Sequence, residues 1–214
     1  MRTVAIRTDD GGLIVYNPVR NLGQDIHSEL AKIGDVRWVI SPNHYHTLAA
    51  DGWQQLYPKA KFFAHLQAHP RLKKQTKVSW LDIVDLIPIL PKGVTLKKPR
   101  GLKTGEIGLC LERPDIKMWI FGDLFFNIPK LPPGLFGFIL RLGGTAPGLH
   151  SSRVFRLIAV SDRQDFLQWL QENLAQDRPQ CFVPTHGEIL FHPALSQRLY
   201  DVASANLKRK KNIS

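Results

Sequence analysis

Three short polar segments, each placed directly after an apolar run, carry the residues best suited to chemistry. They are His44 and His46 after residues 36–40, Asp123 after residues 119–121 and Gly122, and His186 after residues 181–183. Two histidines at positions i and i+2 can point at one metal ion when the backbone between them is extended or turning. Polar side chains at strand ends on one edge of a sheet are typical of α/β active sites. Together, the three segments therefore indicate one polar site at such an edge.

Several common catalytic motifs are absent from the sequence. It contains no GxSxG, GxxxxGK, GxGxxG or HExxH segment, which argues against a nucleophile elbow, a phosphate loop, a dinucleotide fingerprint and a zincin helix. The two cysteines, Cys110 and Cys181, both lie within apolar runs. We expect buried, unreactive thiols there, and two cysteines are too few for a disulfide framework or a four-cysteine zinc site.

Strands and helices alternate in the first half of the chain, as hydrophobic periodicity and turn signals predict. Residues 3–7 and 13–16 flank the turn sequence Asp-Asp-Gly-Gly and predict a β-hairpin. Helical spacing over residues 22–33 ends at Gly34, and residues 47–56 are also predicted to be helical. Apolar runs predict strands over residues 36–40, 61–64, 83–90 and 94–96.

The second half of the chain contains fewer elements and one irregular insertion. Residues 107–111 and 118–121 predict an antiparallel pair, and residues 181–183 predict a short strand. Helices are predicted over residues 161–176, with Ser161 as the N-cap, and over residues 193–207. The insertion begins at Phe125 and ends at His150; we expect either a loop packed on its own core or a lid or partner surface. The whole order predicts a layered α/β domain.

The net charge of +11 is concentrated in two places. The segment that begins at Lys59 and ends at Lys103 holds eleven Lys and Arg residues against two acids, and the tail carries four more cations at residues 208–211. Such patches attract nucleic acid, anionic membranes or small anions. A solvated face with a frayed end is the simpler interpretation, because no aromatic stacking motif is interleaved with the charges.

Domain organisation and location follow from length and hydropathy. We expect one domain over residues 1–206, followed by a basic, disordered tail over residues 207–214. The sequence has no apolar run long enough to span a membrane, and its first residues do not form a secretory signal. We therefore expect a soluble, cytoplasmic protein.

Around these polar segments the sequence resembles the metallo-β-lactamase superfamily, from about Val4 to the final helix. The matching stretches are residues 13–18 in the place of the first strand, HYHTLA over residues 44–49 in the place of the HxHxDH motif, Gly122-Asp123, and residues 184–187 (Pro-Thr-His-Gly). The resemblance implies a four-layer αββα sandwich with two facing mixed sheets. It also implies that His44, His46, Asp123 and His186 are metal ligands, with Asp123 and His186 as catalytic residues.

The motif is degenerate in ways that reduce the expected metal site. Leu48 and Ala49 stand where the family has Asp and His, and Leu102 stands where it has a further His. A two-metal site therefore lacks its other ligands, and we expect at most one metal. The Pro42-Asn43 start is similar to a divergent, largely uncharacterised branch of the superfamily.

The resemblance implies a metal-dependent hydrolase with a mononuclear site, acting on an ester, thioester, lactone or phosphoester. A zinc with three protein ligands keeps an open position for water and lowers the pKa of that water to about 7; iron and manganese also suit His and carboxylate ligands. The basic segment favours an anionic substrate. The alternative is a non-catalytic member of the fold with a decayed metal site that binds a small anion, nucleic acid or a membrane surface. A nuclease is less favoured, because related nucleases generally use two metals.

Overall fold

The protein is built on two five-stranded sheets, seen in a computed structural model that describes residues 1–20, 23–131, 134, 135, 137 and 147–207. The first sheet has the order β1-β2-β3-β4-β5 and the second β12-β11-β8-β7-β6. The strands of the first are β1 (Val4–Arg7), β2 (Gly12–Tyr16), β3 (Asp35–Ile40), β4 (Lys61–Ala64) and β5 (Trp80–Asp82). Those of the second are β6 (Val94–Lys97), β7 (Gly108–Arg113), β8 (Ile116–Phe121), β11 (Cys181–Pro184) and β12 (Leu190–Phe191).

Both sheets are mixed. In the first, β1 and β2 form the predicted antiparallel hairpin, and β2, β3, β4 and β5 run parallel. In the second, β11 lies parallel to β8, whereas the β6–β7, β7–β8 and β11–β12 pairs are antiparallel. A separate two-stranded ribbon joins β9 (Phe126–Ile128) to β10 (Gly148–His150).

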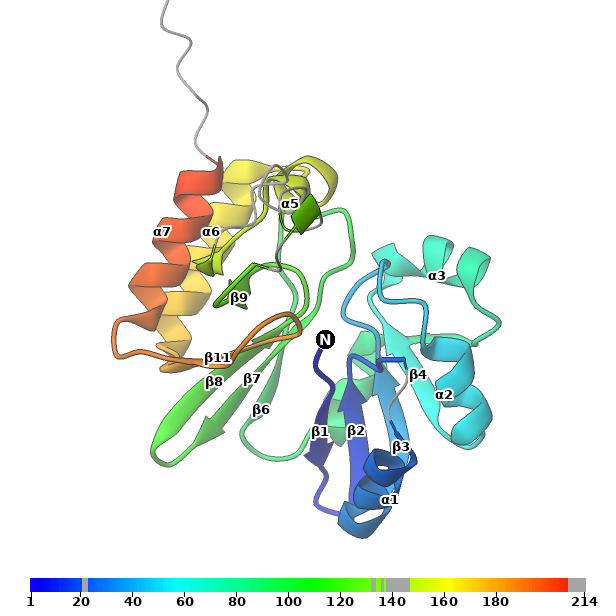
Figure 1. The fold of residues 1–214 in the computed structure, drawn as a ribbon. Coiled ribbons are helices and arrows are strands. Elements are labelled where there is room, and N and C mark those ends of the chain that lie inside the picture. Colours follow the sequence, from blue (N-terminus) through cyan, green and yellow to red (C-terminus); the bar gives the residue numbers. More distant parts are fainter. Residues whose placement is uncertain (21–22, 132–133, 136, 138–146, 208–214) are drawn as a thin grey trace, which may run out of the picture.

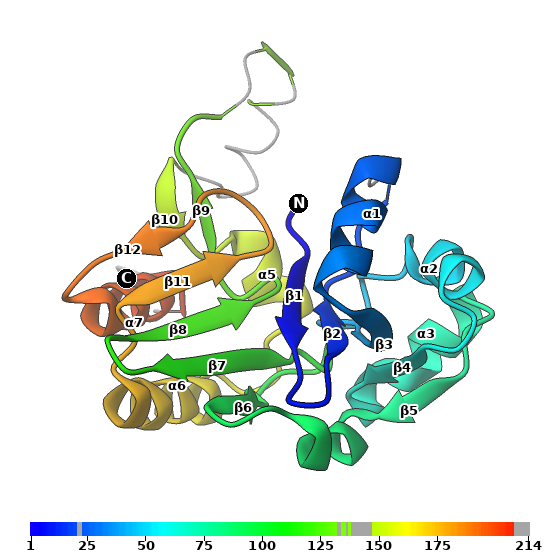
Figure 2. The ribbon, with the colours of Figure 1, turned by 90° about the horizontal axis from the view of Figure 1, so that it is seen from below.

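Helices cover the outer face of each sheet, which confirms the four-layer αββα arrangement (Figures 1 and 2). The first sheet is flanked by α1 (Gln24–Ile33), α2 (Ala50–Leu56) and α3 (His69–Gln75), and the second by α6 (Arg163–Asp177) and α7 (Leu195–Leu207). Shorter elements are α5 (Arg153–Ile158) and the 3₁₀ helices η1 (Leu66–Ala68) and η2 (Ile83–Ile89). None of the helices in the described part of the chain is long and apolar enough to cross a membrane.

Three buried apolar clusters fill the spaces between the four layers. One lies between the sheets and contains Ile14, Tyr16 and Cys181, among others. The other two lie between a sheet and its helices; Leu13 and Val15 belong to the first and Cys110 to the second. Successive residues of β2 therefore face different clusters, which explains why this strand is apolar along its whole length. Both cysteines are buried and unpaired, as predicted.

The predicted elements are confirmed in type, with one exception. The apolar run over residues 83–90 is not a strand but the 3₁₀ helix η2. Ile83 and Leu86 are buried while Val84 and Ile87 are exposed, so the burial repeats every three residues, as in a 3₁₀ helix. Some bounds also differ: α2 begins at Ala50, α7 begins at Leu195, and the N-cap of α6 is Asp162 rather than Ser161.

Two predictions fall wholly or partly outside the described residues. The disordered tail predicted over residues 207–214 is one of them: Leu207 is the buried last residue of α7, and residues 208–214 are not described. The apolar insertion is the other: its ends form β9 and β10, but residues 132–133, 136 and 138–146 are not described.

Candidate metal centre

The carboxyl ends of strands from both sheets meet at one place, and the candidate site lies there. Asn17 directly follows β2, and its backbone N–H donates to Ile40 O at the end of β3 (3.0 Å). On the other sheet, Asp123 follows β8 and His186 follows the parallel strand β11. The Tyr16 hydroxyl donates to Ile107 O at 2.8 Å and so joins the two sheets beneath the site. The site is therefore held by elements of both halves of the sandwich.

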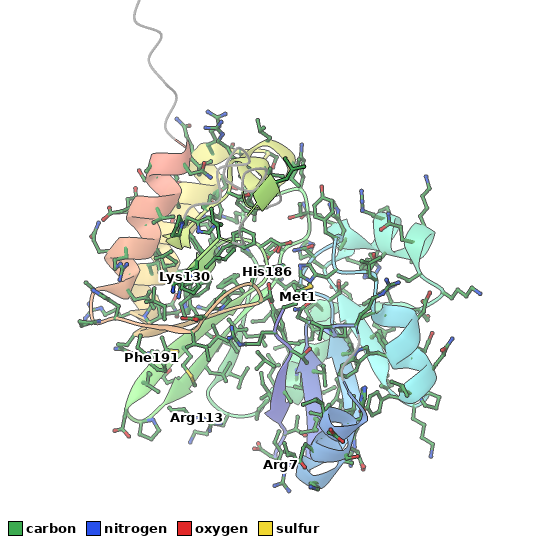
Figure 3. The ribbon with its side chains drawn as sticks, in the orientation of Figure 1. Met1, Arg7, Arg113, Lys130, His186 and Phe191 are labelled. Atoms are coloured by element: carbon green, nitrogen blue, oxygen red, sulfur yellow. The ribbon has the colours of Figure 1, made fainter. Side chains whose placement is uncertain are left out.

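Three of the four predicted ligands come together. The His46 Nε2 atom lies 3.1 Å from Asp123 Oδ2, and His186 Nε2 lies 3.5 Å from Asp123 Oδ1. One ligand atom from each of the three residues falls within 4.8 Å of the other two. Figure 3 shows His186 at the centre of the molecule, close to Met1. We call His46, Asp123 and His186 the metal triad.

Two glycines allow the backbone to bring these residues together. A Cβ atom on Gly122 would lie 2.7 Å from Glu106 Oε1 and 2.8 Å from Pro42 Cβ, so no side chain fits directly before Asp123. Gly187 has φ +99°, and a Cβ there would lie 2.0 Å from Asn127 O on β9. Glycine is therefore required beside both His186 and Asp123.

Asn17 determines which way the His46 ring presents its lone pair. The Asn17 Nδ2 atom donates to Arg2 O at 2.7 Å, so its Oδ1 atom is the end that faces His46 Nδ1, at 2.6 Å. An amide oxygen only accepts, so Nδ1 must carry the proton in that bond. The Nε2 atom then either carries a second proton or points a lone pair at the carboxylate of Asp123. Such a lone pair needs a cation between the two acceptors, which is a requirement that a metal ion would meet.

Hydrogen bonds with Asn43 and Glu106 fix the position of Asp123. The Asn43 Nδ2 atom donates to Asp123 Oδ2 at 2.9 Å and to Glu106 Oε2 at 2.6 Å. The other oxygen of Glu106 accepts from the Asp123 backbone N–H at 2.9 Å. Glu106 is buried, and both its oxygens are used to fix neighbours. These contacts leave Asp123 little freedom to rotate away from the histidines.

Burial and neighbouring charges shift the pKa values of the carboxyl groups in opposite directions. Burial, together with the charge of Asp123, raises the pKa of Glu106 well above its usual value. Burial also acts to raise the pKa of Asp123, but the hydrogen bond and charge of His46, with His186 and Asn43, outweigh it and hold that pKa below its usual value. Burial lowers the pKa of His186. Asp123 is thus the ionised ligand of the group, while Glu106 favours its neutral form.

His44, the fourth predicted ligand, lies outside the metal triad. Its ring packs edge-on against Tyr45 at 4.3 Å between centroids, and its backbone N–H donates to Thr104 O at 3.1 Å. Desolvation and the nearby Arg71 lower the pKa of His44. The loop turns here because the Ser41 hydroxyl lies within hydrogen-bond distance of Asn43 O (2.9 Å) and His46 O (3.1 Å). The fold therefore selects His46 rather than His44.

Sequence reasoning missed Asn17, Asn43 and Glu106 as site residues. Asn17 is a polar residue at the end of an apolar strand, directly before a proline, and Asn43 is next to His44. Glu106 is the single acid between Asp85 and Glu112. These were the signals available, but none of them shows that the three side chains point at one carboxylate.

A pocket of about 250 Å³ opens beside the metal triad. Asp123 and His186 form part of its wall. The other lining residues are Asn43, Tyr45, Thr104, Glu106, Phe126, Ser152, Val154, Phe155, Ile158 and Ala159. A larger cavity of about 690 Å³ includes Trp38, Tyr57 and Lys61, but it contains none of the triad residues. The smaller pocket is therefore the one placed to hold a molecule that reacts at the triad.

The triad fits one divalent metal ion. The contacts of 3.1 and 3.5 Å run to different oxygens of Asp123, and one ligand atom from each residue lies within 4.8 Å of the other two. Ligand atoms about 2.1 Å from a tetrahedral zinc lie roughly 3.4 Å from one another, which is within this range. The Asn17 amide oxygen accepts from the far nitrogen of His46, which is the outer contact that ligating histidines usually make. Leu48 is exposed, while Ala49 and Leu102 are buried apolar residues; none of the three can ligate a second ion. Three protein ligands leave one position of a zinc open.

Comparison with known proteins identifies the architecture. No family model matches the chain, and no curated protein matches it in sequence. Among solved structures, the DIM-1 metallo-β-lactamase exposed to ceftazidime matches with a TM-score of 0.60 and 15% identity, over 95% of this chain and 84% of that one. The mono-zinc form of the metallo-β-lactamase FIM-1 from Pseudomonas aeruginosa has a TM-score of 0.59 and 12% identity, over 96% and 84% of the two chains.

The similarity extends to a protein with a different title. A fragment of the putative diflavin flavoprotein A 5 from Nostoc matches with a TM-score of 0.57 and 15% identity, over 94% of this chain and 81% of that one. Identities this low identify a shared architecture rather than a shared activity. Two mixed sheets between helical layers, with a polar site at their strand ends, agree with that architecture throughout. The chain therefore has the metallo-β-lactamase fold.

Proposed function

We propose that the protein is a metal-dependent hydrolase with a single metal ion held by His46, Asp123 and His186. The observation that carries this proposal is the orientation of His46. Its Nδ1 proton is committed to Asn17, so Nε2 is aimed at the Asp123 carboxylate 3.1 Å away. This arrangement is favourable with a metal ion between the two atoms or with a second proton on Nε2, and the metal content of the protein distinguishes the two.

The proposed reaction adds water to a carbonyl or phosphoryl group. A bound metal would supply Lewis-acid polarisation of that group. The water oxygen forms a bond to the carbonyl carbon, and the bond to the leaving oxygen or sulfur breaks with its electron pair. One water proton ends on the leaving group, and the other is released from the product acid. Asp123 and His186 both line the pocket. His186 would hold the metal there, while Asp123 would hold it through one carboxylate oxygen and keep the other to orient the water and accept its proton.

One feature of the comparisons supports a single-metal hydrolase, and one feature of the structure supports an anionic substrate. The DIM-1 and FIM-1 structures are titled metallo-β-lactamases, and the FIM-1 structure is a mono-zinc form. The pocket beside the triad has an exposed cation near its mouth, because the Arg71 guanidinium lies 4.7 Å from the ring centre of Tyr45, a pocket-lining residue. An anionic ester, thioester, lactone or phosphoester therefore fits the charge of this surface.

Metal content of matched histidine variants tests the proposal. We expect about one equivalent of metal per chain in the purified protein, measured by elemental mass spectrometry after growth with zinc, iron and manganese. His46→Ala and His186→Ala should lose this metal, because each removes one of three ligands. His44→Ala is the matched control: the residue is two positions from His46 but outside the triad, so its metal content should stay the same.

The same experiment separates the proposal from its alternative. If the wild-type protein holds no metal under any of these conditions, a protonated His46 between Asn17 and Asp123 accounts for the geometry, and the hydrolase proposal fails. The protein is then a non-catalytic member of the fold. If metal is present, we expect turnover of at least one ester, thioester, lactone or phosphoester probe, with that turnover lost in His46→Ala.

A further inference from the structure

The pocket beside the metal triad has an apolar wall that the proposed chemistry alone does not require. Helix α5 and the residue after it supply Val154, Phe155, Ile158 and Ala159. Phe155 and Ala159 are buried, whereas Ile158 is 40% exposed and so lies at the mouth. Apolar side chains lining a concave site are typical of pockets that bind an apolar part of a ligand.

The opposite character is found where the pocket meets the triad. Asn43, Asp123 and His186 line it there. Thr104 also belongs to the wall, but its Oγ1 atom is fully buried, so a molecule in the pocket does not reach it. The wall is therefore polar beside the triad and apolar where the pocket leads away from it.

The volume of the pocket limits the size of what it holds. About 250 Å³ is room for roughly eight groups of about 30 Å³ each, the volume of one water molecule in the liquid. That matches a short apolar chain or a single aromatic ring, and it is too small for a long lipid chain.

We propose that this pocket binds an apolar acyl group of about eight non-hydrogen atoms, with its carbonyl end at Asp123 and His186. The inference rests on the proposed hydrolase function and narrows it. The substrate is an acyl ester or thioester of medium chain length rather than a phosphoester, because a charged phosphoryl group gains nothing from contact with the apolar wall. Hydrolysis then joins the water oxygen to the acyl carbon, breaks its bond to the leaving oxygen or sulfur, and places a proton on the leaving group.

Binding of linear alkanamides to the metal-free protein tests this pocket without any catalysis. These amides are neutral, so the Asp123 carboxylate does not repel them as it would repel a fatty acid. In calorimetric titrations with EDTA present, affinity should rise about fourfold for each added methylene group from butanamide to octanamide. It should stop rising beyond octanamide, when the pocket is full. Affinity that does not depend on chain length would overturn the proposal.

Two neighbouring residues of α5 provide a matched pair of variants. Ile158→Trp fills the mouth of the pocket and should weaken octanamide binding at least tenfold. Leu157→Trp adds the same ring one position earlier, on a side chain that is 67% exposed and does not line the pocket; binding should stay within twofold of wild type. Equal effects of the two variants would contradict the proposal. Far-ultraviolet circular dichroism of each variant checks that the fold is intact.

Failure of this inference and failure of the proposed function are distinguishable. If the protein never takes up metal but binds amides with an affinity that depends on chain length, the acyl pocket is supported and the hydrolase proposal is wrong. If it takes up metal but turns over acetyl and octanoyl esters equally, the hydrolase proposal is supported and the acyl pocket is wrong.

Discussion

Asn17 connects a backbone constraint to the chemistry of the site. It has φ +59°, a left-handed conformation that Asn adopts more readily than most residues. In this conformation its side chain reaches both Arg2 O and His46 Nδ1, and its own carbonyl accepts from the Thr3 hydroxyl at 2.8 Å. One residue therefore ties the first strand, the second strand and the metal triad together.

Replacing Asn17 should weaken metal binding more than it changes the fold. Without the amide oxygen, His46 is free to rotate and to change tautomer, so Asn17→Ala and Asn17→Gly should both lose about 10- to 100-fold in metal affinity. Glycine accepts the positive φ and alanine does not, so Asn17→Ala should unfold at a free energy about 1 kcal/mol lower than Asn17→Gly. Competitive chelator titration and urea unfolding give the two quantities. Wild-type metal affinity in both variants would show that the contact does not orient His46.

The site residues divide into those that the sequence could reveal and those that it could not. His46, Asp123 and His186 were predictable because ligand-type side chains after apolar strands are an uncommon pattern. Glu106 was not, because an acid in a basic, glycine-rich stretch is usually on the surface. Glu106 is buried because residues 104–107 contact the segments that follow β3 and β8. His44 and His46 were equivalent in sequence, and the turn around Ser41 separates them.

At the scale of the elements, β6 and α6 are joined by a buried ion pair. Lys97 Nζ lies 2.6 Å from Asp177 Oδ2, and the two side chains are only 8% and 9% exposed. The Trp119 indole N–H donates to the same carboxylate oxygen at 2.7 Å. One of the eleven cations in the basic segment is thus committed to the interior. Arg100 is also paired, with Asp165 and Glu172.

Removing Asp177 should destabilise the protein strongly. Asp177→Ala leaves the buried Lys97 ammonium without its carboxylate, with the neutral Asn173 oxygen 3.4 Å away, and leaves the Trp119 N–H without its acceptor. We therefore expect a loss of about 3–5 kcal/mol in the free energy of unfolding. Asp165→Ala is the control on the same helix, because its pair with Arg100 has side chains 41% and 47% exposed. Its loss should be about 0–1 kcal/mol. Similar losses for the two variants in urea unfolding would contradict the assigned role of burial.

Short, mostly apolar strands were the elements that the sequence predicted best. The expected bounds of β4 agree with the structure, and those of β3 and β11 differ by one residue, because a polar or turn residue follows each apolar stretch. The run over residues 83–90 has the same apolar character and was wrongly predicted. Pro88 and the three-residue repeat of Ile83, Leu86 and Ile89 were the signals of a 3₁₀ helix. Composition alone does not separate the two.

For the molecule as a whole, the two sheets bury opposing carboxyl groups at their junction, and this makes stability depend on pH. Glu106 has a raised pKa in the folded protein, so its favourable contribution is complete below its unfolded pKa of about 4.5 and is lost as the pH rises through the folded value. Asp123 has a lowered pKa, so its contribution is present above its unfolded value and is lost as the pH falls through the folded one.

Glu106→Gln should therefore change the slope of stability against pH. In EDTA, the free energy of unfolding of the wild type should fall relative to this variant as the pH rises above about 4.5, by at most about 1.4 kcal/mol per pH unit. Subtracting the two curves removes the titration of the histidines that both proteins share. Glu188→Gln, at an exposed carboxylate, should leave the slope unchanged. A variant parallel to wild type at all pH values would show that Glu106 has an ordinary pKa.

The distribution of charge on the molecule does not select one partner, so the partners of the protein stay a prediction. The free cations of the basic segment include Arg71 and Lys103, which lie near the pocket, and the tail at residues 208–211 is outside the described residues. A small anion, nucleic acid and an anionic membrane each agree with this distribution. The fold was predictable at this scale because the order of strands and helices is a property of the whole chain, whereas a partner is recognised by a few side chains.

The two thiols lie in different layers, and each is therefore a natural reporter of one internal boundary. Cys110 packs between the second sheet and its helices, whereas Cys181 packs between the two sheets. Burial raises the pKa of Cys110 to about 11, so the reactive thiolate is scarce at neutral pH while the thiol stays buried. Alkylation of Cys110 records separation of the helices from their sheet, and alkylation of Cys181 records separation of the sheets. The order in which the protein comes apart can thus be read by mass spectrometry from its own two cysteines.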